Sequence, residues 1–128
     1  MKYGFVRVAA ASPELRVADV SFNSKKIIEL INEANKNHVE FIVFPELCIT
    51  GYTCGDLFMK DTLIEGAKEA LLKIAQATMG SSLVSVIGLP LIISGRLYNC
   101  AAVLQNGRIL GIVPKTYLPN YNEFYEAR

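Results

Sequence analysis

A short apolar strand that ends at a proline constrains the fold of this chain more than any other feature. Residues 41–44 are Phe, Ile, Val and Phe in succession, and Pro45 follows directly. A continuous apolar run of this length is typical of a strand that is buried on both faces of a sheet. Because proline cannot donate to the hydrogen-bond ladder, we expect the strand to end there and to place Glu46 at its carboxyl end. In α/β sheets that end is where ligands bind.

The rest of the chain alternates strand and helix patterns around this segment. We expect five strands, at residues 5–11, 40–44, 83–89, 97–104 and 108–113, and two helices, at about 24–36 and 62–78. Asn23 or Ser24 is expected to cap the first helix. Asn106-Gly107, between two apolar runs, predicts a two-residue hairpin turn. The order βαβαβββ predicts an α/β fold with a mixed sheet and helices on one face, and the other face also needs a cover because the central strands are apolar on both sides.

The composition argues against several functional classes. The chain has 128 residues, of which 52% are hydrophobic and 20% charged, with a formal net charge of +1. This is enough for one domain with a real core, and no basic cluster predicts binding to nucleic acid or to a membrane surface. No run reaches transmembrane length, and Lys2 and Arg7 interrupt the N-terminal apolar stretch, so we expect no signal peptide. The expected location is the cytoplasm.

The three cysteines, Cys48, Cys54 and Cys100, are odd in number and come without a secretory signal. This pattern predicts reduced thiols. They form no CxxC pair, and the single histidine, His38, lies far from all of them in sequence, so we expect no metal site. We interpret the cysteines as small buried hydrophobes and His38 as a loop residue at a helix end.

A second strand repeats the pattern of the first. Val113-Pro114-Lys115 ends an apolar run at a proline and then places one ionisable residue, as Phe44-Pro45-Glu46 does. If the two strands run in the same direction in one sheet, Glu46 and Lys115 lie at the same edge, and an ion pair of about 4 Å is expected. The alternative is that they are two ordinary charged residues in separate loops.

The two motifs resemble those of a known family. The segment around Glu46, which continues to Gly51-Tyr52, is similar to the glutamate motif of the nitrilase superfamily of carbon–nitrogen hydrolases. Lys115, followed by Leu118-Pro119 and Phe124-Tyr125-Glu126, is similar to the lysine motif of that superfamily. The longer segments 51–58 and 115–126 resemble the glutaminase domain of the glutamine-dependent NAD synthetase family. The resemblance spans essentially the whole chain and implies the N-terminal half of a four-layer α-β-β-α sandwich.

The resemblance also implies roles for individual residues. The family uses a catalytic triad of Glu, Lys and Cys, in which Glu46 corresponds to the general base and Lys115 to the group that stabilises the oxyanion. Glu126 corresponds to a second, supporting glutamate that orients the lysine. Tyr52 and Tyr121 correspond to positions that line the glutamine pocket, and packing is an equal alternative for both.

The chain departs from the family pattern at the nucleophile. In the family the nucleophilic cysteine follows a further strand beyond the lysine motif, whereas this sequence ends at Arg128 and none of its three cysteines has that position. We therefore expect residues 1–128 to be a partial glutaminase domain that is inactive by itself. We also expect it to associate with itself through apolar sheet surface that lacks its cover.

For the parent protein the resemblance implies glutamine as substrate and ammonia as product. The ammonia passes to a C-terminal synthetase domain that uses ATP and Mg to amidate deamido-NAD, and the fragment itself needs no cofactor. Two alternatives remain open: another nitrilase branch, such as an amidase or carbamoylase, and a non-catalytic assembly module that pairs through a sheet edge. Cys54-Gly55-Asp56 and Tyr121-Asn122-Glu123 favour the glutaminase.

Overall fold

The computed structural model describes residues 4–55, 57 and 60–115. The elements follow one another as β1 (Val8–Ala10), α1 (Val20–Lys36), β2 (Phe41–Val43), α2 (Asp61–Ala77), β3 (Val84–Ile93), β4 (Arg96–Gln105) and β5 (Arg108–Pro114). The predicted order βαβαβββ is therefore confirmed.

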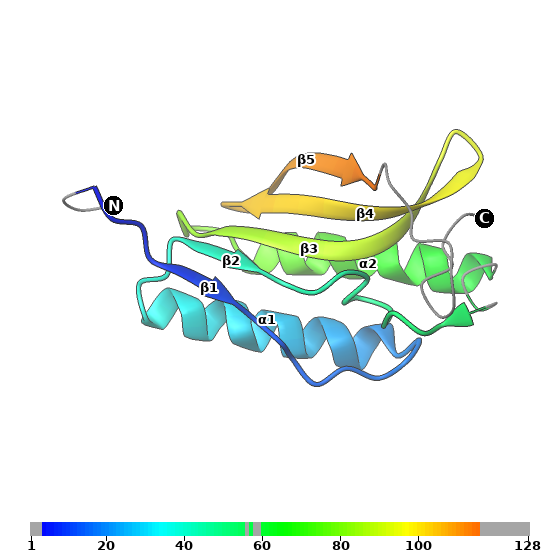
Figure 1. The fold of residues 1–128 in the computed structure, drawn as a ribbon, viewed down its shortest axis with the longest axis horizontal. Helices are drawn as coiled ribbons and strands as arrows, with labels where there is room; N and C mark the ends of the chain where they lie inside the picture. The colour runs from blue at the N-terminus through cyan, green and yellow to red at the C-terminus, as the bar shows by residue number, and fades with distance from the viewer. Residues whose placement is uncertain (1–3, 56, 58–59, 116–128) are drawn as a thin grey trace.

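The five strands form one mixed sheet in the order β1-β2-β3-β4-β5 (Figure 1). Strands β1, β2 and β3 are parallel, whereas β4 is antiparallel to β3 and β5 is antiparallel to β4. Two reversals bring β5 back to the direction of β2, so the carboxyl ends of these two strands lie at the same edge of the sheet. The condition that the sequence left open for Glu46 and Lys115 is met.

Both helices pack against one face of this sheet. Each helix buries one apolar stripe, with Ile27 and Ile31 of α1 and Ile74 of α2 completely inaccessible to solvent. These side chains join Ile42 of β2 and Ile87 of β3 in a single hydrophobic core. The helices lie side by side along the sheet because right-handed crossovers place both of them on the same side of the parallel strands (Figure 1).

The opposite face of the sheet is apolar and open to solvent in the described part of the chain. Strand residues alternate between faces, so the neighbours of buried Ile42 point away from the helices. Phe41, Val43 and their neighbour Val8 on β1 are 37%, 42% and 66% exposed, and Val113 on β5 is 60% exposed. We call this surface the open face. The prediction of strands that are apolar on both sides is confirmed, and the described residues cover only one side.

The start of α1 differs from the expectation. The helix begins at Val20, and the side chain of Asp19 caps it by accepting a hydrogen bond from the N–H of Phe22. Asn23 and Ser24 are therefore helical residues and not caps. Asn23 is fully buried because its amide bonds to backbone groups of two loops, which is a use that its preference for helix ends does not reveal.

The hairpins fit the turn signals. Asn106 and Gly107 both have positive φ, 48° and 77°, as the predicted two-residue turn between β4 and β5 requires. Ser94 and Gly95 form a similar turn between β3 and β4. The sequence-based expectation lacks this turn, since it places the end of the third strand at Leu89. β3 continues through Pro90, which pairs with Asn99 of β4 and lies beyond Val86, the last residue that pairs with β2. The missing N–H of Pro90 is on the β2 side of the strand and therefore costs no hydrogen bond between strands.

Candidate active site

Glu46 and Lys115 form an ion pair although 69 positions separate them in sequence. Lys115 Nζ donates a hydrogen bond of 3.0 Å to Glu46 Oε1. The pair lies at the edge where β2 and β5 both end, as predicted. The Lys115 side chain is 24% exposed and that of Glu46 51%, so the described residues leave the carboxylate accessible to solvent. Two groups of opposite charge are thus held together at a site that a small molecule can reach.

The turn after β2 sets the position of Glu46. Leu47, the next residue, has φ of 53°, a left-handed conformation that is uncommon for a residue other than glycine. Its carbonyl oxygen accepts hydrogen bonds from the N–H groups of Thr50 (3.1 Å) and Gly51 (2.7 Å). Backbone strain of this kind is concentrated at functional sites, where surrounding contacts hold it in place. Glu46 is therefore part of a tight, internally bonded turn.

A buried amide from α1 holds the far side of the same turn. The side chain of Asn23 donates to the carbonyl oxygens of Ile49 (3.0 Å) and Arg16 (2.8 Å), and its own oxygen accepts from the N–H of Arg16 (2.7 Å). Asn23 thereby ties the loop before α1 to the loop after β2. The sequence does not reveal this function, because an asparagine near a helix start is usually a cap.

A continued hydrogen-bond ladder positions Lys115. Its backbone N–H donates to the carbonyl oxygen of Asn99 on β4 at 2.8 Å, which extends the pairing of β4 and β5 by one residue beyond Pro114. Lys115 follows Val113 by two positions and so faces the same side of the sheet, the open face. The ion pair lies on this face, away from the helices.

Tyr52 is partly buried in the loop just after Gly51. Its predicted role in a substrate pocket stays a prediction. Tyr121 and Glu126 lie outside the described residues.

The three cysteines are free and buried, as the sequence predicted. Burial raises the pKa of the Cys48 thiol to about 12, and its S–H donates to the carbonyl oxygen of Gly88. Burial also raises the pKa of the Cys54 and Cys100 thiols. Since the thiolate is the nucleophile, none of these cysteines is poised for attack. Among the described residues, no group of three or more His, Cys, Asp or Glu is placed to hold a metal ion, and no helix could cross a membrane.

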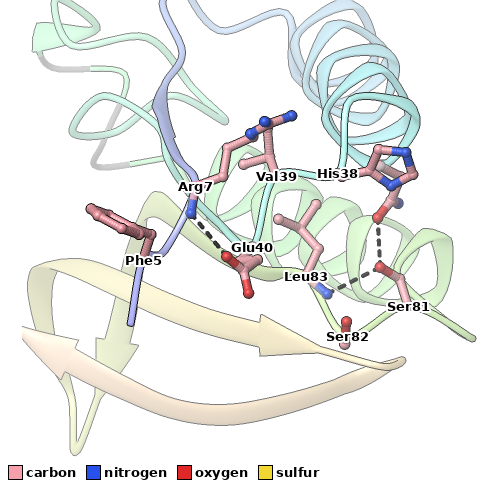
Figure 2. Close-up of a pocket in the computed structure, with 9 residues that line it drawn as sticks. Phe5, Arg7, His38, Val39, Glu40, Ser81, Ser82 and Leu83 are labelled. Carbon is pink, nitrogen blue, oxygen red and sulfur yellow. Dashed lines mark hydrogen bonds between the residues drawn. The ribbon is translucent and has the colours of Figure 1, made fainter. Parts of the chain in front are cut away.

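A pocket of about 600 Å³ lies at the opposite end of the sheet, where the parallel strands begin (Figure 2). Arg7, Glu40 and Leu83 line it, each directly before a strand, and His38 lies beside them at the end of α1. Two of the lining residues bond to each other: the backbone N–H of Arg7 donates to the Glu40 carboxylate at 2.9 Å (Figure 2). Size alone does not make this pocket the reactive site, and the charged pair is at the other edge. His38 is exposed with φ of 58°, which confirms it as a loop residue.

A carboxylate beside an ammonium group has a defined chemical use. The carboxylate can accept a proton from a nucleophile, and the ammonium can stabilise negative charge that develops on a carbonyl oxygen. This pairing suits acyl transfer at an amide. The class of protein follows from the sequence profile described as carbon-nitrogen hydrolase, which matches residues 6–127. The chain belongs to the carbon–nitrogen hydrolase family.

Within that class the chain is similar to particular enzymes. It is 37% identical over 127 residues to a glutamine-dependent NAD(+) synthetase of Mycobacterium tuberculosis, a match that covers 99% of this chain and 19% of that protein. Solved structures of such synthetases from Cytophaga hutchinsonii and from Acinetobacter baumannii, the latter with ADP, match with TM-scores of 0.88 and 0.84 at 37% and 33% identity. These matches cover 94% and 92% of this chain, and 20% and 22% of the two solved chains. The chain thus spans about a fifth of the length of the relatives that it matches.

An amidase from Nesterenkonia sp. shares the fold more distantly. Its structure matches with a TM-score of 0.74 at 20% identity, over 93% of this chain and 45% of that one. The expected nitrilase-like α/β fold is confirmed by these neighbours.

Proposed function

We propose that this chain forms part of a glutamine amidohydrolase domain, which releases ammonia within a glutamine-dependent NAD synthetase. The observation that carries the proposal is the ion pair of Glu46 and Lys115 on the open face. The similarity to synthetases over nearly the whole chain supports glutamine as the substrate. Residues 1–128 then correspond to part of the glutaminase domain.

Each residue of the pair has one task in this proposal. Glu46 accepts the proton of a cysteine thiol as the thiolate attacks the amide carbon of glutamine, and it passes that proton to the nitrogen that leaves as ammonia. Lys115 stabilises the oxyanion of the tetrahedral intermediate. Tyr52 and Tyr121 contribute to the glutamine pocket, and Glu126 orients Lys115. These assignments rest on the family motifs and, for Glu46 and Lys115, also on their contact.

The nucleophile is not one of the three cysteines of this chain. Their thiols are buried, and burial raises the pKa of each. We infer that a cysteine of the longer parent protein attacks the substrate and that this chain alone hydrolyses no glutamine. We also infer that the open face is buried in the parent. In this chain it should drive self-association, which light scattering at high micromolar concentration would detect.

The remaining partners belong to the parent protein. We propose a C-terminal synthetase domain that uses ATP and Mg to amidate deamido-NAD with the released ammonia. The similarity to a synthetase solved with ADP supports the use of an adenine nucleotide. Assembly as a homo-oligomer in the cytoplasm, without nucleic acid or membrane, completes the proposal.

The test is ammonia release from glutamine by the parent protein and by its Glu46→Gln and Lys115→Met variants. We expect both substitutions to lower the rate by at least about 10³-fold, because the members of a catalytic unit act together. NAD formation from added ammonia is the control, and it should survive in both variants. Hydrolysis of other amides in preference to glutamine would favour an amidase or carbamoylase, and full activity in both variants would favour an assembly module.

A further inference from the structure

Gly88 on β3 lies directly beneath the turn that carries Glu46. A Cβ atom at this position would be 2.4 Å from the backbone nitrogen of Leu47 and 2.7 Å from the carbonyl oxygen of Pro45. Distances this short cannot be accommodated without a shift, and the atoms in the way are backbone, so no side-chain rotation can relieve them. The φ of Gly88 is not positive, and strand geometry there suits any residue. Glycine is therefore needed for space and not for backbone conformation.

The same residue also bonds to the turn. The carbonyl oxygen of Gly88 accepts hydrogen bonds from the N–H of Ile49 at 3.2 Å and from the S–H of Cys48 at 3.5 Å. The backbone on both sides of Glu46 thus packs against Gly88 of the central strand, and Cys48 and Ile49 are hydrogen-bonded to the same residue. Because Gly88 has no side chain, the turn that carries Glu46 can lie close to β3.

The sheet register links this position to Lys115. Gly88 pairs with Ala101 of β4, which pairs with Val113 of β5, and Lys115 follows two residues later on the same face. A row of hydrogen-bonded strands therefore fixes Lys115 relative to Gly88. A side chain at Gly88 would lift the Glu46 turn off the sheet, whereas Lys115 would keep its place.

We propose that Gly88 is a positioning residue, which seats the turn so that the carboxylate of Glu46 meets the ammonium of Lys115. The geometric part of this inference stands on the structure of this chain alone, and the consequence for catalysis rests on the proposed function. The positioning acts through Glu46, since Gly88 has no group that could react with a substrate.

The experiment compares Gly88→Ala with Gly111→Ala. Gly111 is the matched control because it also lies in a strand on the open face without positive φ, and a Cβ there would meet nothing within 4 Å. In this chain, the chemical shifts of the Lys115 side chain report the contact, because Glu46→Gln removes the charge beside Lys115 and should change these shifts. We expect the shift change caused by Glu46→Gln to be at least twofold smaller in the Gly88→Ala background. In the Gly111→Ala background it should be unaltered. An equal change in both would overturn the proposal.

The second readout uses the parent protein. We expect Gly88→Ala to lower kcat for glutamine hydrolysis by about 10- to 100-fold with KM within about twofold, because a small misplacement of a reacting group slows the chemical step. Gly111→Ala should match the unsubstituted enzyme. A raised KM with unchanged kcat would overturn the catalytic part. If the parent hydrolyses no glutamine at all, the proposed function fails, and the seating of Glu46 is judged from the NMR comparison.

A milder pair of variants serves if Gly88→Ala does not fold. Cys48→Ala removes one hydrogen bond to Gly88. Cys100→Ala also removes a buried thiol, but the S–H of Cys100 donates to the carbonyl oxygen of Tyr98 on its own strand. We expect the response of Lys115 to Glu46→Gln to weaken measurably in Cys48→Ala and to persist in Cys100→Ala. The same response in both variants would show that contacts at Gly88 do not set the position of Glu46.

Discussion

The two faces of the sheet differ in their exposure to solvent. The face beneath α1 and α2 is covered, with Ile27, Ile31 and Ile87 fully buried. The open face leaves Val43 and Val113 exposed and carries the ion pair. In this chain, stability comes mainly from the helix-covered face, whereas the groups that can do chemistry lie on the face that the described residues leave uncovered. Substitutions on the two faces should therefore act on different measurements.

Neighbouring residues of β2 give the largest expected contrast. Ile42 is 3% exposed and faces the helices, and Val43 is 42% exposed and faces the other way. Ile42→Ala should lower the free energy of unfolding by about 3 kcal/mol, because it removes buried methyl groups and leaves a cavity. Val43→Ala should cost less than about 1 kcal/mol, mainly through strand preference. Urea denaturation measures both, at a protein concentration low enough to keep the chain monomeric. Equal losses there would mean that the open face is covered by other residues of the chain.

The buried amide that joins the two loops gives the next effect. Asn23→Ala removes the partner of the Arg16 N–H and of the Ile49 carbonyl oxygen, whereas the Arg16 carbonyl oxygen keeps its bond from the N–H of Asp19. The free energy of unfolding should fall by about 3 kcal/mol. Asn32→Ala is the control, since Asn32 is exposed on the same helix and should change stability by less than about 0.5 kcal/mol. If the two variants were equally stable, the anchoring of the Glu46 turn by α1 would be refuted.

The pH dependence of stability reports burial around the thiols. Burial raises the pKa of Cys48 to about 12, whereas the unfolded chain loses this proton near the ordinary value of 9. Between these values the folded state binds more protons, so its stability is complete below pH 9 and falls as pH rises, by at most about 1.4 kcal/mol per pH unit for one thiol. Urea midpoints from pH 8 to 10.5 should fall less steeply in Cys48→Ala. Identical slopes would contradict the burial of this thiol.

The sequence predicted where Glu46 and Lys115 lie better than it predicted the residues that hold them there. Proline after an apolar run marked both strand ends, and the strand order placed Glu46 and Lys115 at one edge, because hydrophobic periodicity and proline chemistry are local signals. Gly88 and Asn23 carried no such signal. A glycine inside a strand and an asparagine near a helix start have common local explanations, and their actual contacts are made with segments that are tens of residues away.

The start of α1 shows the same limit. Asp19, Asn23 and Ser24 are all residues that cap helices well, so preference could not choose among them. The choice is made by tertiary structure, since Asn23 is needed inside the helix to reach Ile49.

The smallest expected loss of stability is at the ion pair, and it tests whether the charges on the open face contribute to folding. Lys115 and Glu46 are in direct contact, yet both side chains are partly exposed, and ion pairs of this kind contribute at most about 1 kcal/mol. Lys115→Met keeps most of the apolar stem and should lower the free energy of unfolding of this chain by less than about 1 kcal/mol. Raising the salt concentration should shrink that difference further, because exposed charges are screened. Urea denaturation at low and high salt measures both effects. A loss above 2 kcal/mol would make the pair a structural element of the sheet. A small loss means instead that the contact between the two charges adds little to stability. In the proposed function, a substrate can then separate Glu46 from Lys115 at little cost to the fold.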